Sequence, residues 1–179
     1  MMDIKKMANK LAKQHHSRNP FEIIKGLNII LVFVPLVGVK GFYQYFQRNN
    51  LIYIDDSLPY HEQVFVCAHE LGHMMLHKKS NAIFMDTYTG FNTTKYEIEA
   101  NKFAVELLIP DEMLLEYQEF TTEQFSRMLG YNEELIKLKF KWKKGEKSMK
   151  KKVLLLSVIF SLMFSVTGCT SPKETKNEF

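Results

Sequence analysis

The segment CAHELGHMMLH, residues 67–77, contains two histidines four positions apart with a glutamate directly after the first. On a helix, His69 and His73 lie on one face about a turn apart, so both imidazoles can reach one metal ion. Glu70 lies about 100° round the helix from His69, where it can contact a metal-bound water. The pattern predicts that the histidines bind zinc and that Glu70 takes a proton from the attacking water.

A catalytic zinc site also needs a third protein ligand. The metzincin pattern would place a histidine six residues after His73, and Lys79 at that position excludes that class. The helical segment YEIEANKFAVELLIP offers Glu97, which shares a helix face with small residues that allow close approach to the motif helix. We interpret Glu99 and Glu106 as solvated surface residues, with Glu99 as the alternative ligand.

AHELGHMMLH, followed some 20 residues later by EIEANKFAVELLIP, resembles the ImmA/IrrE family of zinc metallopeptidases. The resemblance covers roughly residues 5–115, including NPFEIIKGLNIILVFVPL and the segment IYIDD. It implies a gluzincin-type HExxH site in a zincin-like fold, with Glu70 as general base, one Zn²⁺ per chain, and Asn101 orienting a motif histidine. The implied zinc ligands are His69, His73 and Glu97. The resemblance also implies cleavage of a regulatory protein, such as a helix-turn-helix repressor of a mobile element or a stress-response regulator.

Other side chains near the two motifs have more than one interpretation. His77, one turn after His73, is a structural residue or supports a ligand through a hydrogen bond. Tyr88 and Tyr96 flank the second motif, and either could stabilise an oxyanion, although ordinary packing is the simpler interpretation of each. Cys67 is interpreted as a small buried apolar residue.

The elements that position these residues follow from apolar periodicity and from turn-forming residues. The motif helix is expected from Tyr60 to His77, with Val64, Ala68, Leu71 and Met75 as its apolar stripe and Gly72 allowing close packing. Before it we expect helices at about 4–14 and 20–24, a strand from Leu27 closed by Pro35, and a hairpin of 42–47 and 51–56 around Arg48-Asn49-Asn50. After it we expect helices at about 95–108, 111–117, 122–130 and from Asn132 onward. This order predicts an α+β fold in which a small antiparallel sheet packs on helices.

Charge and composition limit the classes of partner. Five of the 24 Lys and Arg and two of the 20 Asp and Glu lie in residues 149–179, so residues 1–148 carry 19 basic and 18 acidic side chains. This near-neutral body gives no electrostatic sign of direct nucleic-acid binding, and the expected partner is a protein. TTEQFSRMLGYNEELIKLKFK loosely resembles a helix-turn-helix, but its basic run is more simply a solvated face. A zinc-stabilised module that binds a transcriptional regulator without cutting it is the alternative function.

Residues 149–179, MKKKVLLLSVIFSLMFSVTGCTSPKETKNEF, have the pattern of a bacterial lipoprotein signal. Cys169 would be lipidated if this tail were processed. We therefore divide the chain into a metallopeptidase-like domain at 1–148 and a tail at 149–179, interpreted as a fused reading frame or, alternatively, a membrane anchor. The N-terminal residues have no apolar signal core, so the expected location is cytoplasmic, with membrane association only through the tail.

Overall fold

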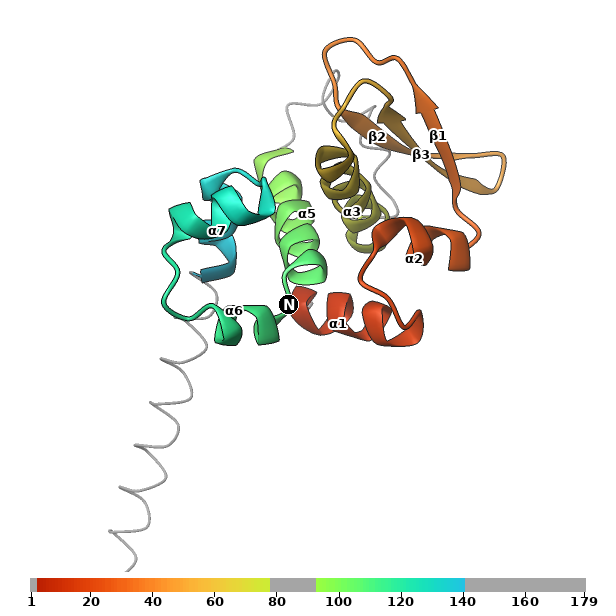
Figure 1. Ribbon diagram of the computed structural model, residues 1–179. Coiled ribbons are helices and arrows are strands. Elements are labelled where there is room, and N and C mark those ends of the chain that lie inside the picture. The colour runs from red at the N-terminus through yellow and green to blue at the C-terminus, as the bar shows by residue number, and fades with distance from the viewer. Residues whose placement is uncertain (1–2, 78–92, 141–179) are drawn as a thin grey trace, which may run out of the picture. The chain divides into compact units, whose positions relative to one another are not determined.

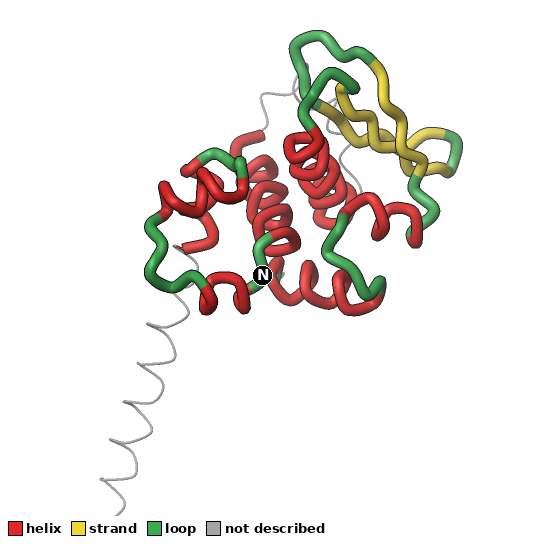
Figure 2. The backbone as a smooth tube through the Cα atoms, viewed as in Figure 1, coloured by secondary structure: helices red, strands yellow, loops and turns green. Residues whose placement is uncertain are grey.

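The computed structural model describes residues 3–77 and 93–140 of the chain. One compact unit spans Met1–Lys139, and a second begins at Phe140. The elements, in order, are α1 (Ile4–Gln14), α2 (Pro20–Gly26), β1 (Ile30–Val34), β2 (Gly41–Phe46), β3 (Asn49–Asp55), α3 (Tyr60–Leu76), α5 (Thr93–Leu108), α6 (Asp111–Glu116), α7 (Thr122–Leu129) and a helix at 133–140. The predicted α+β class is confirmed (Figure 2).

The boundary predicted at residue 148 lies outside the described residues, as does the tail with Cys169. Across the two described ranges, no helix has both the length and the apolar character needed to span a membrane.

The sheet has three strands in the order β1-β3-β2. β2 and β3 form the expected antiparallel hairpin, whereas β1 pairs with β3 in parallel, so the sheet is mixed and not wholly antiparallel. Val34 at the end of β1 lies opposite Asp55, and Gly41 at the start of β2 lies opposite Ile54. The connection at 35–40 therefore crosses the carboxyl end of β3 and makes β2 the edge strand nearest α3 (Figure 1).

The hairpin turn differs in position from the predicted Arg48-Asn49-Asn50. Gln47 and Arg48 form it, with φ of 47° and 66°, while Asn49 and Asn50 already pair with β2. A two-residue turn with positive φ at both positions matches the twist of the two strands, which explains why the turn is this short. Asn50 contributes inside the hairpin, because its Oδ1 accepts a hydrogen bond of 2.9 Å from the Tyr43 hydroxyl.

Helix α3 lies between the sheet and α5 (Figure 1). The inner face of the sheet buries Tyr43, Ile52 and Ile54. Because α3 has neighbours on two sides, its buried surface is wider than the predicted stripe: Ala68 and Leu71 are fully buried, but Val64 and Met75 are only partly so. The buried residues of α3 are Val66, Cys67, Ala68, Glu70, Leu71, Gly72, His73 and Met74. Cys67 is buried and free, as predicted, and burial raises the pKa of its thiol well above the usual range.

The carboxyl end of α5 is held by Arg18, which the sequence did not single out. Its guanidinium donates to the backbone carbonyls of Glu106 at 3.1 Å and Leu107 at 2.9 Å, and to Asn9 Oδ1 at 2.7 Å. The last carbonyls of a helix lack partners within the helix and carry its negative dipole end, so a cation there stabilises it. Arg18 thus ties the α1–α2 segment to the helix that carries the second motif.

The interpretation of Glu106 as a solvated residue is wrong. Its side chain is buried and pairs with Lys139, which is also buried, from helix 133–140. Lys139 also contacts Asp111 at 3.0 Å, and Asp111 contacts Lys5 at 2.7 Å. Burial alone would raise the pKa of Asp111, but hydrogen bonds from the two lysines outweigh it and lower the pKa to about 2. The sequence misled here because helix 133–140 covers the side of α5 that looked free.

We expect Lys139→Met to lower the free energy of unfolding by about 3 kcal/mol, because it leaves Glu106 buried without its cationic partner. Urea unfolding followed by circular dichroism measures this loss. Lys137→Met is the matched control, because Lys137 pairs with Glu133 and Glu134 on the exposed side of the same helix. The urea midpoint of the Lys137→Met protein should stay near that of wild type. Equal midpoints for the two variants would contradict the importance of the buried network.

Candidate metal centre

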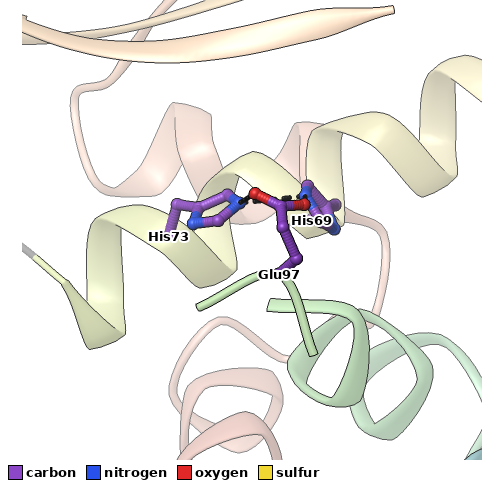
Figure 3. Close-up of side chains that lie close together, drawn as sticks. All are labelled: His69, His73 and Glu97. Atoms are coloured by element: carbon purple, nitrogen blue, oxygen red, sulfur yellow. Dashed lines mark hydrogen bonds and ion pairs between the residues drawn. The ribbon is translucent and has the colours of Figure 1, made fainter. Parts of the chain in front are cut away.

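The two motifs meet where α3 faces the amino-terminal half of α5. Figure 3 shows Glu97 between the rings of His69 and His73. The Nε2 atoms of the two histidines are 3.0 Å apart, and each lies 3.2 Å from one carboxylate oxygen of Glu97. The structure therefore brings together the three residues predicted as zinc ligands.

These three donors suit a single zinc ion. One ligand atom from each of the residues lies within 4.8 Å of the others. Tetrahedral zinc with ligand bonds of about 2.0–2.1 Å keeps its donor atoms about 3.3 Å apart, close to the separations seen here. Two imidazoles and one carboxylate leave a fourth coordination position open, which is the donor set of a catalytic zinc site and not of a closed structural one.

Asn101 lies one turn after Glu97 on α5 and contacts the first histidine. Its Oδ1 is 2.9 Å from Nδ1 of His69. An amide oxygen can only accept, so this contact favours a proton on Nδ1 and leaves Nε2 as the atom that would bind a metal ion in place of its own proton. This is the geometry expected of a residue that orients a metal ligand.

The two carboxylates of the site differ in their affinity for protons. Hydrogen bonds from His69 and His73 hold the pKa of Glu97 well below its usual range, so this side chain stays ionised. Burial raises the pKa of Glu70, although the two histidines and the backbone of Tyr43 partly oppose that rise. Glu97 thus has the properties of a ligand, and Glu70 those of a group that exchanges a proton.

A cavity of about 940 Å³ adjoins the three donors. Residues of α3 and α5 that line it include His69, Glu70, His73, Glu97 and Asn101. One further side is formed by β2 and the connection before it, with Val39, Lys40, Gly41 and Phe42. Another is formed after α7 by Gly130, Tyr131, Asn132 and Leu135. The cavity is large enough to admit a segment of another polypeptide to the donors.

The other residues that the sequence suggested for the site lie in different parts of the structure. His77 Nε2 is 3.3 Å from the Glu99 carboxylate, so these two residues face each other beside the cluster and outside the group of three donors. The ring of Tyr96 packs edge-on against His77, with centroids 4.4 Å apart, which fits the packing interpretation. Tyr88 lies outside the described residues. Tyr131 lines the cavity and was missed, because a tyrosine between two short helices carries no sequence signal of chemistry.

Gly72 sets the distance between the two motif helices. A Cβ built on Gly72 would lie 3.1 Å from Cβ of Phe103 and 3.2 Å from both Cα and the carbonyl oxygen of Ala100. These contacts are tighter than ordinary van der Waals separations, and two of them involve backbone that cannot rotate away. The close packing predicted at Gly72 is therefore present, and its neighbour is the turn of α5 between Glu97 and Asn101.

Comparison with known proteins places the chain in a family. Residues 25–144 match the family model described as the IrrE N-terminal-like domain, Peptidase_M78. The chain is 42% identical over 139 residues to "Uncharacterized immunity region protein 2" of Bacillus phage phi105, covering 76% of this chain and 88% of the phage protein. It is 33% identical over 129 residues to Metallopeptidase ImmA of Bacillus subtilis (strain 168), covering 69% of this chain and 75% of that protein.

A solved structure of a Mycobacterium tuberculosis transcriptional regulator is similar with a TM-score of 0.54 and 14% identity. The similarity covers 78% of this chain and 47% of the regulator, so the chain spans about half of that protein. At this identity the likeness concerns the fold alone.

We expect Gly72→Val to lower the free energy of unfolding by about 2 kcal/mol, because the added side chain must push α5 away from α3. The displacement should also weaken zinc binding, because it moves Glu97 away from the histidines. Thermal unfolding and zinc titration measure the two effects. Lys10→Val, at an exposed position of α1, controls for the helix propensity of valine alone. Wild-type zinc affinity in Gly72→Val would show that the spacing of the helices does not matter to the site.

We expect wild type and Glu70→Gln to retain one zinc per chain after dialysis, and His69→Ala, His73→Ala and Glu97→Ala to lose it. Asn101→Ala should weaken zinc binding about tenfold, because the histidine ring loses its orienting partner. Elemental analysis and competition with a chelating dye measure both. Glu99→Ala is the matched control for Glu97→Ala, and zinc loss in Glu99→Ala alone would transfer the third ligand to Glu99.

Proposed function

Because the chain belongs to the ImmA/IrrE family of metallopeptidases, we propose that it is a zinc-dependent endopeptidase that cleaves a regulatory protein. The observation that carries this proposal is the position of Glu70, a buried carboxylate that lines the same cavity as the three donors. A site that only held zinc for stability would not need a second carboxylate with a raised pKa beside it.

In this proposal His69, His73 and Glu97 hold the ion. Zinc bound there supplies the Lewis acidity that polarises the scissile carbonyl and makes a water molecule more acidic. Glu70 takes a proton from the attacking water and delivers it to the amine nitrogen as the peptide bond breaks. The raised pKa of Glu70 suits both steps, because its carboxylate holds a proton more readily than an exposed glutamate does.

The edge of β2 can align a substrate chain. The carbonyl of Lys40 accepts a hydrogen bond from the amide of Asp55. The backbone N–H and C=O groups of even-numbered residues of β2 therefore point toward β3, and those of odd-numbered residues point away from it. The backbone N–H of Tyr43, which points away from β3, donates a hydrogen bond to the Glu70 carboxylate. The outward backbone groups of Gly41 lie beside the cavity, where an extended peptide could add to the sheet edge. Glycine at position 41 lets β2 pack closely on α3, because a Cβ there would lie 2.5 Å from Val66.

The substrate class comes from the relatives. The phage relative is named for an immunity region, and the Bacillus relative is named a metallopeptidase, ImmA. We therefore propose that the protein cut is a transcriptional repressor of a phage or other mobile element, with a helix-turn-helix repressor as the expected form. Direct DNA binding by residues 122–140 is less well supported, because Lys139 of the lysine-rich helix is buried against Glu106.

The test is co-expression of the full chain with the helix-turn-helix repressor encoded nearest its gene, followed by immunoblotting of the repressor. We expect wild type to remove the intact repressor and Glu70→Gln to leave it intact, because Glu70→Gln keeps the ligands and loses the base. The same pair of purified proteins, with and without a zinc chelator, checks that the cut is direct.

Two results would reject the proposal. Cleavage by Glu70→Gln at the wild-type rate would show that another protease acts. An intact repressor with both zinc-loaded proteins, together with its co-purification with each, would favour the non-proteolytic binding module.

A further inference from the structure

We propose that Tyr131 is a further catalytic residue, whose hydroxyl donates a hydrogen bond to the scissile carbonyl oxygen as negative charge develops on it. This inference rests on the proposed peptidase function and adds a residue from outside both sequence motifs. A preorganised donor aimed at the developing oxyanion adds to the stabilisation that a metal ion supplies, and such a donor commonly contributes a factor of about 10²–10³ to kcat.

Tyr131 stands in the same cavity as the proposed base and ligands. Its ring lies 5.4 Å from that of Phe65, and Phe65 lies 6.3 Å from the ring of His69, one turn further along α3. The ring of Tyr131 therefore lies beside the turn of α3 that precedes His69. A hydroxyl there can reach a substrate carbonyl that has entered the cavity.

The backbone around Tyr131 is fixed on both sides. Gly130 ends α7 in the left-handed conformation, with φ of 72°, and Ser126 Oγ donates to the Tyr131 carbonyl at 2.6 Å. Asn132 then caps the next helix, because its Oδ1 accepts from the Glu134 amide at 2.8 Å. Gly130 also packs on α3, since a Cβ there would lie 2.9 Å from the ring of His61. A preorganised donor needs this kind of fixed support.

The hydroxyl of Tyr131 has no hydrogen-bond partner within residues 3–77 and 93–140. Two other polar side chains of the cavity are already engaged: Lys40 binds Glu62 at 2.5 Å, and Asn101 binds His69. Burial raises the pKa of Tyr131, so its phenol keeps its proton at neutral pH and can serve as a donor. Tyr131 thus offers a substrate a protonated donor that no other group of the described residues uses.

In the proposed step, the oxygen of water bonds to the carbonyl carbon while Glu70 takes one of its protons. Tyr131 donates a hydrogen bond to the carbonyl oxygen and keeps its own proton. When the C–N bond breaks, Glu70 returns the proton to the amine nitrogen and the carbonyl re-forms as a carboxylic acid. Tyr131 acts only on the charged oxygen, so its contribution belongs to the transition state and not to substrate binding.

The decisive comparison is Tyr131→Phe, which removes one oxygen atom and keeps the ring against Phe65. With the repressor as substrate, we expect kcat to fall about 100-fold, with KM within about twofold and zinc content unchanged. Tyr60→Phe is the matched control, because Tyr60 is exposed at the start of α3 and does not line the cavity. A kcat for Tyr131→Phe within twofold of wild type would overturn the proposal.

A second readout does not depend on cleavage. Acetohydroxamate binds zinc as an anion, so its carbonyl oxygen carries part of a negative charge, like the oxygen of the transition state. Its binding to the zinc-loaded full chain can be measured by calorimetry. We expect Tyr131→Phe to bind it about tenfold more weakly than wild type or Tyr60→Phe, and equal affinity would overturn the proposal. If the wild type binds it more tightly than Tyr131→Phe but cuts no repressor, the proposed substrate fails while the position of the Tyr131 hydroxyl stands.

Discussion

The close approach of α3 to α5 at Gly72 is the constraint on which the candidate site depends. Packed helices usually lie 8–10 Å apart, a distance set by the side chains at the contact. Here the contact is made by Gly72 on one helix and by Ala100 on the other, so a glutamate one turn away can reach both histidines. Glycine in a helix interior costs about 1 kcal/mol relative to alanine, and the geometry of the three donors is a sufficient reason to keep it.

Environment gives two carboxylates of the site different properties. Glu97 is half exposed and receives hydrogen bonds from two imidazoles, and these keep its pKa low. The side chain of Glu70 is buried, and the loss of water around its carboxylate raises its pKa. Two glutamates with the same intrinsic chemistry can therefore serve as ligand and base, because their surroundings separate their proton affinities. This separation is what supports a hydrolytic interpretation over a purely structural zinc site.

The sequence predicted those parts of the molecule that depend on local spacing. His69 and His73 are paired by one turn of a helix, and Glu97 shares a face with Ala100 and Asn101, so both motifs could be placed before any packing was known. Glu106 and Lys139 were misjudged because each looks exposed on its own helix, and only their mutual packing buries them. The parallel pairing of β1 could not be predicted either, because it depends on how residues 35–40 cross the sheet.

The contacts that the sequence did not predict are also those that complete the cavity. Glu106 and Asp111 bind Lys139 of helix 133–140, and Gly130 packs on His61 of α3. Tyr131 lies between these two attachments, so the side of the cavity that carries it is fastened to both helices that supply the donors. Similarity in fold to the Mycobacterium tuberculosis regulator, at 14% identity, does not show how the side chains of the cavity are placed. Proteins with the same fold carry out many different reactions. Proteolysis would therefore depend on how these particular side chains converge, and the terminal helices belong to the site as much as the HExxH helix does.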